Sequence, residues 1–181
     1  MSAHATPETV EAHKLTVEQF HDVGPFLDPR HRHELLDGKI RTMPPPGDPH
    51  SSVLDELNRQ FVRQERRGLC VSSGGLRLSE TTELWPDLCL LERKRDGRGN
   101  PPAPSARLVV EVSDTTLGDD TGDKLRAYQA AGVPEYWVVD VNGRRVLRYL
   151  APDYAPEAFT EGNLSPQAYP DASIDVGALF S

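Results

Sequence analysis

Apolar and polar positions alternate with helical or strand spacing through most of the chain. A capping box at residues 16–19 precedes a short apolar face and predicts a helix that ends near the Gly-Pro pair at 24–25. Asp37-Gly38 lies between two apolar-containing runs, which is a strong signal for a hairpin turn. We therefore expect an entry helix followed by two antiparallel strands over 33–40.

A proline-rich stretch separates this hairpin from the next helix. Residues 44–49 predict a rigid connector, because proline fixes the backbone and removes a hydrogen-bond donor. The next segment predicts a helix from Ser51 to Arg67, with Ser51 or Ser52 as its cap and Gly68 as its end. Its apolar positions recur at helical spacing: Val53, Leu54, Leu57 and Phe61.

Four short runs rich in Leu and Val predict strands, and we expect all four in one sheet. They are residues 69–71, 75–78, 84–91 and 106–112. The charged segment KRDGRGNPPAPS, which precedes the last run, predicts a mobile surface loop.

The remaining elements complete a mixed α/β fold. Residues 121–131 predict a second helix with Leu125, Tyr128 and Ala131 on its buried face. Asn142-Gly143 predicts a hairpin between two further strands. The order of elements indicates a central mixed sheet flanked by helices.

Length and composition favour one soluble domain over residues 1–181, with 1–14 as a flexible N-terminal segment. The chain has 181 residues, of which 37% are hydrophobic. It has no run of about 18 apolar residues and no basic-then-apolar leader, so we expect a cytoplasmic protein with no membrane partner. Cys70 and Cys89 lie in apolar runs and are expected as buried free thiols.

The net charge of −8 argues against a protein that coats nucleic acid non-specifically, because such binding depends on Lys and Arg. Any nucleic-acid surface must be local. Most basic clusters are solvated faces. The clusters here are Arg59, Arg63, Arg66 and Arg67; Arg93, Lys94, Arg95 and Arg98; and Arg144, Arg145 and Arg148.

Asp87 and Glu111 are the candidate site residues that the pattern itself indicates. Each lies beside buried apolar residues, where an unpaired carboxylate costs several kcal/mol by order of magnitude. On neighbouring strands, both could bind one divalent cation, and oxygen ligation suits Mg²⁺. Lys124, near a helix start, could orient water or stabilise charge on a phosphate.

Each of these residues also has a structural interpretation. Asp87 could form a turn after Pro86, and Glu111 could pair with an arginine. Lys124 is only mildly unusual, since the helix dipole disfavours a cation at that end. The three signals gain weight from their order along the chain.

Several sequence motifs resemble the bacterial putative restriction endonuclease family of the PD-(D/E)XK nuclease superfamily. They are RHELLDGKI, MPPPGDPH, GLRL, WPDLCLL, LVVEVSDTTLGDDTGDKLRAYQAAGVPEYWVVD and IDVGALF, which span most of the chain from about residue 31. The resemblance implies an αβββαβ-type, restriction-endonuclease-like core. It also implies that Asp87 and Glu111 bind Mg²⁺ or Mn²⁺ while Lys124 supports phosphodiester hydrolysis.

The same resemblance extends the site and shows one departure. Glu34 matches a catalytic-site glutamate near the metal, and His50 matches a frequent histidine, which we assign to the metal. Alternatively, Glu34 only flanks the hairpin and His50 only caps the helix. The superfamily motif places lysine two residues after the glutamate, where this chain has Ser113, and Lys124 follows Glu111 by thirteen residues.

Three functions remain open from the sequence. The favoured one is a metal-dependent endonuclease acting on nucleic acid, with DNA as the expected substrate. The alternatives are a catalytically silent nucleic-acid or protein interaction module and a metal-dependent hydrolase of another substrate. Cutting of two strands favours a homodimer, with an edge strand at 144–150 as a candidate contact.

Overall fold

A computed structural model describes residues 13–64, 70–92 and 99–181 of the chain, without the side chain of Cys70. A six-stranded mixed sheet forms its main body, in the order β10-β9-β8-β7-β6-β3. Only β7 and β8 in this sheet run parallel, and the helices α3 and α4 connect them. The strands are β3 (Cys70–Ser72), β6 (Leu88–Leu91), β7 (Ala106–Ser113), β8 (Glu135–Asp140), β9 (Arg145–Leu150) and β10 (Pro156–Phe159).

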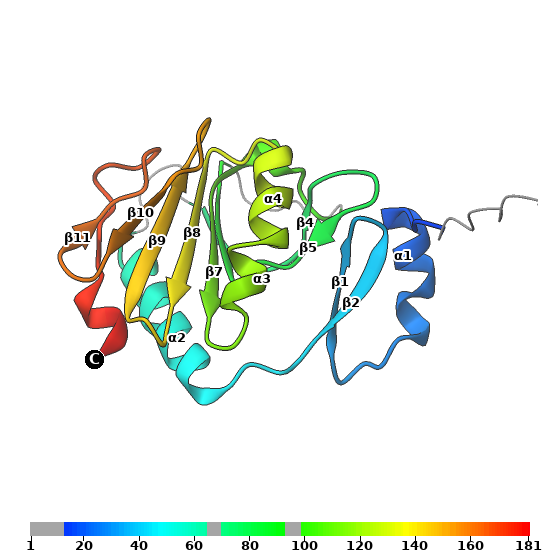
Figure 1. Cartoon of the computed structure of the whole chain (residues 1–181), viewed down its shortest axis with the longest axis horizontal. Helices are drawn as coiled ribbons and strands as arrows, with labels where there is room; N and C mark the ends of the chain where they lie inside the picture. Colours follow the sequence, from blue (N-terminus) through cyan, green and yellow to red (C-terminus); the bar gives the residue numbers. More distant parts are fainter. Residues whose placement is uncertain (1–12, 65–69, 93–98) are drawn as a thin grey trace, which may run out of the picture.

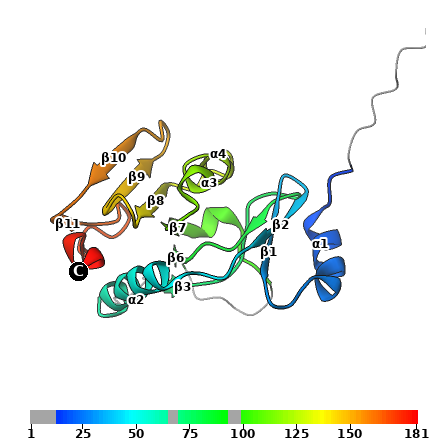
Figure 2. The same ribbon diagram turned by 60° about the horizontal axis from the view of Figure 1, so that its bottom comes forward.

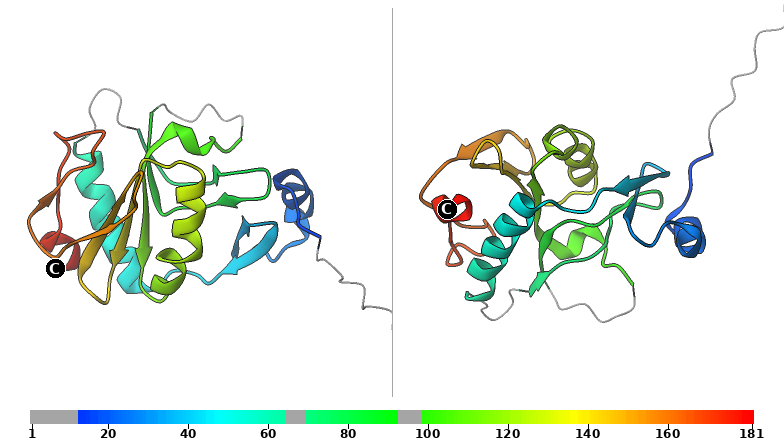
Figure 3. Two further views of the ribbon diagram at one scale, coloured as in Figure 1. Left: turned by 45° about the horizontal axis from the view of Figure 1, so that its top comes forward. Right: turned by 90° about the horizontal axis from the view of Figure 1, so that it is seen from below.

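Helices cover the two faces of this sheet (Figures 2 and 3). On one face, α2 (Asp48–Val62) packs Val53, Leu57 and Phe61 against apolar side chains of β6, β7 and β8. On the other face lie α3 (Leu117–Asp120) and α4 (Asp123–Ala130), with Tyr128 of α4 buried against the sheet. The sheet and these helices, with the C-terminal segment, are called the sheet body below.

A smaller lobe lies beside the sheet body (Figure 1). It contains a four-stranded sheet in the order β2-β1-β5-β4, and α1 (Val17–Val23) packs Val17 and Phe20 against it. Its strands are β1 (Arg32–Leu36), β2 (Lys39–Met43), β4 (Leu76–Arg77) and β5 (Glu83–Leu84). We call α1 and these strands the hairpin lobe.

The C-terminal segment packs on the α2 side of the sheet body. It contains β11 (Asn163–Leu164) and β12 (Ile174–Asp175), which pair with each other, and a last 3-10 turn, η3 (Gly177–Phe180). Shorter 3-10 turns, η1 (Gly24–Phe26) and η2 (Ala103–Ser105), follow α1 and precede β7. Within the described ranges, no helix is long and apolar enough to cross a membrane.

Both local signals at the start of the chain are confirmed. Thr16 caps α1 and accepts the backbone N–H of Gln19, whose side chain binds the Thr16 backbone in return. Asp37 and Gly38 both have positive φ, at 50° and 74°. Positive φ at both central residues is the geometry of the tight turn that matches strand twist.

The expected sheet was wrong in one respect, because the four runs divide between two sheets. Residues 84–91 form two strands instead of one, since Pro86 interrupts the run and lacks an N–H for a ladder. The first piece, β5, joins β4 in the hairpin lobe, and β6 joins β3 and β7 in the sheet body. The chain therefore passes from one lobe to the other at Asp87.

Helix boundaries also differ from expectation. Helix α2 begins at Asp48 after Gly47, so Pro49 lies in its first turn, where a missing N–H costs nothing, and Ser51 is not the cap. It ends at Val62 instead of continuing to residue 67, and Gly68 lies outside the described residues. The second helix is two pieces, α3 and α4, joined at Gly122.

The second hairpin forms, but with a different turn. Positive φ falls on Arg144 and not on Asn142-Gly143, in a four-residue loop between paired Asp140 and Arg145. Gly143 is needed for space, because a Cβ there would lie 2.2 Å from the Asp140 carboxylate. Strand β10 pairs along β9, so residues 144–150 are not an edge strand as expected. The homodimer itself stays a prediction.

Two further expectations concern segments that are only partly described. Cys89 is a buried thiol, as expected. The flexible N-terminal segment falls largely on residues outside the described ranges, at 1–12, and the loop at 94–105 falls partly outside them, at 94–98. Of the described loop residues, 103–105 form η2, which buries Ala103.

Candidate active site

The candidate site lies where the sheet body meets the hairpin lobe. Strand β6 pairs antiparallel with β7, and Leu88 faces Val110, so Asp87 and Glu111 are placed at adjacent positions of neighbouring strands. A cavity of about 280 Å³ opens there. Among the residues that line it are Arg32, His50, Asp87, Glu111, Asp114, Asp120 and Lys124.

Asp87 is held by groups from three elements. Its Oδ2 accepts the backbone N–H of Val112 at 2.8 Å and lies 3.1 Å from Nε2 of His50 on α2. Its Oδ1 faces the guanidinium of Arg32 on β1 at 3.6 Å. Burial alone would raise the pKa of Asp87, but His50, the Val112 N–H and Arg32 together hold it below its ordinary value. Asp87 is therefore a carboxylate.

Glu111 points from β7 toward α4. Its Oε1 accepts hydrogen bonds from the Lys124 ammonium at 3.1 Å and from the Tyr128 hydroxyl at 2.8 Å. Burial raises the pKa of Glu111 well above its ordinary value; Lys124 opposes this shift, and the nearby carboxylates add to it. The alternative interpretation, in which Glu111 pairs with an arginine, does not hold among the described residues, because Lys124 takes that place.

Lys124 lies among three carboxylates. Its side chain is 4% exposed, and its Nζ lies 3.1 Å from Glu111, 3.5 Å from Asp120 and 3.6 Å from Glu34. Burial alone would lower the pKa of Lys124, but the three carboxylates raise it above the ordinary value. The lysine is therefore a permanent ammonium, and these charges offset the unfavourable dipole at the start of α4.

Glu34 reaches this cluster from the hairpin lobe. It is fully buried in β1, and its Oε1 accepts the backbone N–H of Trp85 at 2.9 Å. Its Oε2 has no hydrogen-bond partner among the described residues. The Lys124 ammonium lies 3.6 Å from this oxygen, beyond hydrogen-bond distance. A buried carboxylate oxygen without a hydrogen bond is costly, so Oε2 is suited to accept a further donor or a cation.

Asp120 was not identified from the sequence, although it is buried in the same cluster. Its Oδ2 accepts the hydroxyls of Ser113 at 2.6 Å and Thr116 at 2.5 Å, while its Oδ1 faces Lys124. Ser113 occupies the position where the superfamily motif has lysine. Asp120 therefore links Lys124 on α4 to Ser113 on β7, the strand position where the motif has lysine. The four-residue spacing of Asp120 and Lys124 could have indicated this pair.

The structure brings together Asp87, Glu111, Lys124 and Glu34. His50 on α2 lies against Asp87, on the side of its Oδ2. His50 contacts Asp87 through Nε2, and its Nδ1 is buried without a partner among the described residues. Throughout the described ranges, no three His, Cys, Asp or Glu side chains are grouped as a metal site. Mg²⁺ commonly uses only one or two protein carboxylates and keeps several waters, so a full protein cage is not required.

Comparison with solved structures identifies the fold class. A crystal structure of a putative nuclease belonging to DUF820 from Anabaena variabilis superposes with a TM-score of 0.72. The match covers 92% of this chain and 97% of that chain at 16% sequence identity. The mixed sheet and its flanking helices therefore have the fold of that protein.

The family follows from the sequence match. The Uma2 family profile, described as "Putative restriction endonuclease", matches residues 17–177. The chain belongs to this family. The comparison with curated proteins gives no match. The restriction-endonuclease-like fold expected from the sequence is confirmed.

Proposed function

We propose that this protein is a metal-dependent endonuclease that hydrolyses phosphodiester bonds of nucleic acid, with DNA as the expected substrate. The observation that carries the proposal is the convergence of Asp87, Glu111 and Lys124 on one cavity. Family membership and the nuclease fold neighbour agree with it.

The charge balance of the cluster supports a divalent cation. Four carboxylates, Glu34, Asp87, Glu111 and Asp120, are buried here, and Lys124 is the buried ammonium among them. Their mutual repulsion and burial raise the pKa of Glu111, and a bound cation would favour its ionised form. Oε2 of Glu34, which accepts no hydrogen bond from the described residues, also supports a cation here, since oxygen donors suit Mg²⁺ or Mn²⁺.

We assign Asp87 and Glu111 as the residues that would hold the cation. Asp87 offers Oδ1, because Oδ2 already accepts the Val112 N–H. Glu111 offers Oε2, because Lys124 and Tyr128 both contact Oε1. When bound, the cation would polarise the scissile phosphate and lower the pKa of a coordinated water. His50 is assigned a supporting place on Asp87 or as a further ligand.

The protein groups have separable roles in this scheme. Because its pKa is raised, Lys124 keeps its protons and is suited to stabilise negative charge on a phosphate oxygen, not to act as a base. Tyr128 and Lys124 fix the rotamer of Glu111, and Glu34 and Asp120 fix Lys124. The side chains are thereby oriented before substrate arrives.

The test compares metal binding and cleavage in the same buffers. We expect Asp87→Asn and Glu111→Gln to abolish Mn²⁺ binding in calorimetry and to lower plasmid nicking at least about 100-fold. Glu83→Gln is the matched control, because Glu83 is also buried but binds His21 in the hairpin lobe. It should bind Mn²⁺ and nick DNA as the wild type does.

Two outcomes would contradict the proposal. Folded wild type that binds neither Mn²⁺ nor Mg²⁺ would favour the interaction-module alternative on the same fold. Metal binding that is lost in both variants, without cleavage of DNA or RNA by the wild type, would favour a metal-dependent hydrolase of another substrate.

A further inference from the structure

A second cavity adjoins the candidate active site and has a different charge balance. It measures about 340 Å³ and shares Arg32, His50, Asp87 and the prolines at 44–46 with the first. Its charged or titratable lining consists of Arg30, Arg32, His50 and Asp87. The first cavity is lined by four carboxylates, Asp87, Glu111, Asp114 and Asp120, together with Lys124 and the shared Arg32 and His50. The first cavity is therefore acidic, whereas the second has Asp87 as its one lining carboxylate, and Arg32 lies where the two adjoin.

Arg32 is the arginine that lines both cavities. Its side chain is 44% exposed, and its guanidinium lies 3.6 Å from Asp87 Oδ1, which is longer than a hydrogen bond. A guanidinium has five N–H donors in a fork that matches two phosphate oxygens. Arg32 is thus an accessible cation whose donors are not saturated by the described residues.

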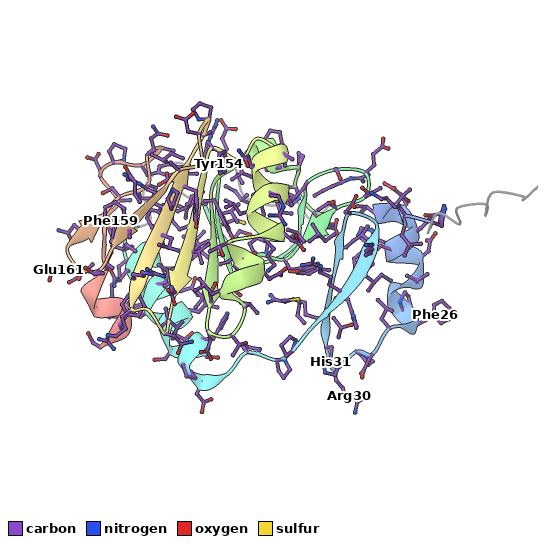
Figure 4. The ribbon with its side chains drawn as sticks, in the orientation of Figure 1. Phe26, Arg30, His31, Tyr154, Phe159 and Glu161 are labelled. Carbon is purple, nitrogen blue, oxygen red and sulfur yellow. The ribbon has the colours of Figure 1, made fainter. Side chains whose placement is uncertain are left out.

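Arg30 provides a contrast within the second cavity. Its guanidinium makes a two-pronged contact with Asp28, at 2.9 Å and 2.7 Å, and it is mostly exposed. Figure 4 shows Arg30 beside His31, where the chain enters β1 at the end of the hairpin lobe. Its charge is already neutralised by Asp28, whereas Arg32 faces a carboxylate that the proposed cation would also engage.

We propose that Arg32 binds a backbone phosphate of the nucleic acid in the second cavity, next to the phosphate that is cleaved. This inference rests on the proposed function and names a substrate contact of the same site. In the free protein Arg32 lies at Asp87 Oδ1. A cation held by that oxygen would repel the guanidinium and leave its donors for the phosphate. The strand then passes from the acidic cavity over the prolines at 44–46.

The test is the salt dependence of binding, because each phosphate contact adds a nearly fixed amount to the slope of log affinity against log salt. The probes are a short fluorescein-labelled DNA duplex and an RNA duplex of the same sequence, measured by anisotropy with Ca²⁺ present to avoid cleavage. For Arg32→Ala we expect about tenfold weaker binding and a slope lower by about one. Arg32→Lys should keep the slope while losing part of the affinity, because one charge remains without the fork.

Arg30→Ala is the matched control from the same cavity and should change affinity less than about twofold, since Asp28 already holds that charge. Calorimetry with Mn²⁺ tests whether the site survives: Arg32→Ala should bind Mn²⁺ at least as tightly as the wild type. An unchanged salt slope, or loss of Mn²⁺ binding in Arg32→Ala, overturns the assignment while the nuclease proposal stands. Wild type that binds neither duplex overturns both.

Discussion

At the scale of single residues, the site is a cluster of buried charges that do not balance within the protein. Lys124 is the central ammonium, and Glu111, Glu34 and Asp120 all lie within 3.6 Å of it. Breaking a buried ion pair by removing one partner leaves an uncompensated charge, which costs far more than losing a surface pair. The stability of the metal-free protein should therefore depend strongly on this one side chain.

Lys124→Met tests that dependence. We expect the free energy of unfolding, measured in urea with a chelator, to fall by about 3–5 kcal/mol, because three carboxylates lose their counter-charge. Added Mg²⁺ should restore part of the loss, since a ligand of the folded state stabilises it. Lys39→Met, at an exposed position of β2, should change stability by less than about 0.5 kcal/mol. Equal unfolding free energies for Lys124→Met and Lys39→Met would contradict the role of Lys124 as the counter-charge of the three carboxylates.

Sequence reasoning found Asp87, Glu111 and Lys124, and the resemblance added Glu34 and His50, but Asp120 and the role of Tyr128 were missed. Asp87 and Glu111 were detectable because each stands next to apolar runs that strands bury. Asp120 was read only as part of a polar helix start, and Tyr128 as an apolar contact, since its hydroxyl partner is a distant residue. Arg32 carried no signal, because its position at the cavity depends on how two lobes meet.

At the scale of secondary-structure elements, the first hairpin turn was predictable, whereas the second turn and sheet membership were not. The Asp37-Gly38 turn formed as expected because two adjacent residues determine it. The split of residues 84–91 depends on pairings of β5 with β1 and of β6 with β7, which join residues far apart in sequence. The αβββαβ-type order survives as α2, β3, β6, β7, α4 and β8, whose strands all lie in the six-stranded sheet, while β4 and β5 join the other sheet.

Strand β8 has a buried carboxylate that is unrelated to the site. Glu135 accepts the indole N–H of Trp137 at 2.7 Å and the backbone N–H of Gln167 at 2.6 Å, so it connects the sheet to the C-terminal segment. Burial raises the pKa of Glu135 above its ordinary value of 4.5, although these two donors and Arg148 oppose the shift. Folding therefore favours the protonated carboxyl.

This shift predicts a pH dependence of stability. Because the folded pKa is higher than the unfolded one, the stabilising contribution of the Glu135 carboxyl is full below about pH 4.5 and decreases as pH rises through the folded pKa. Wild type should thus exceed Glu135→Gln in unfolding free energy by its largest margin in acid. This margin should shrink toward neutral pH. Urea unfolding across this range measures it.

A matched variant isolates the effect of burial. Glu157→Gln removes an exposed carboxylate that pairs with Arg148, so it should leave the pH profile nearly unchanged. A wild-type advantage over Glu135→Gln that grew with rising pH would mean that the two N–H donors outweigh burial at Glu135.

At the scale of the whole molecule, the candidate site depends on how the hairpin lobe sits on the sheet body. Leu36, Leu76 and Leu84 of the lobe pack into the same apolar cluster as Tyr128 and Tyr136 of the body. Arg41 on β2 adds two ion pairs across the boundary, to Asp119 and to Asp123, each at 2.5 Å. Glu34 and Arg32 reach the site only if this contact holds.

Arg41→Ala tests the boundary. We expect a loss of about 1 kcal/mol in the free energy of unfolding, because both ion pairs are partly exposed. Amide hydrogen exchange should become faster in β1 and β2 and stay unchanged in β7 and β8, since local opening involves the lobe alone.

Arg126→Ala is the control for charge, because the ion pair of Arg126 is made with Asp123 within α4. It should leave exchange in β1 and β2 unaltered. Uniformly faster exchange throughout Arg41→Ala would show that the lobe and the body open as one unit.

Trp85, whose backbone N–H donates to Glu34, is a fluorescent side chain next to the candidate site. The chain has two tryptophans, and Trp137 is fully buried in the sheet. Trp85 lies one residue before Pro86 and two before Asp87, and its own N–H donates to Glu34. Its half-buried indole is therefore a built-in fluorophore at the junction of both lobes, and we expect its emission to change when the site is occupied, without an added label.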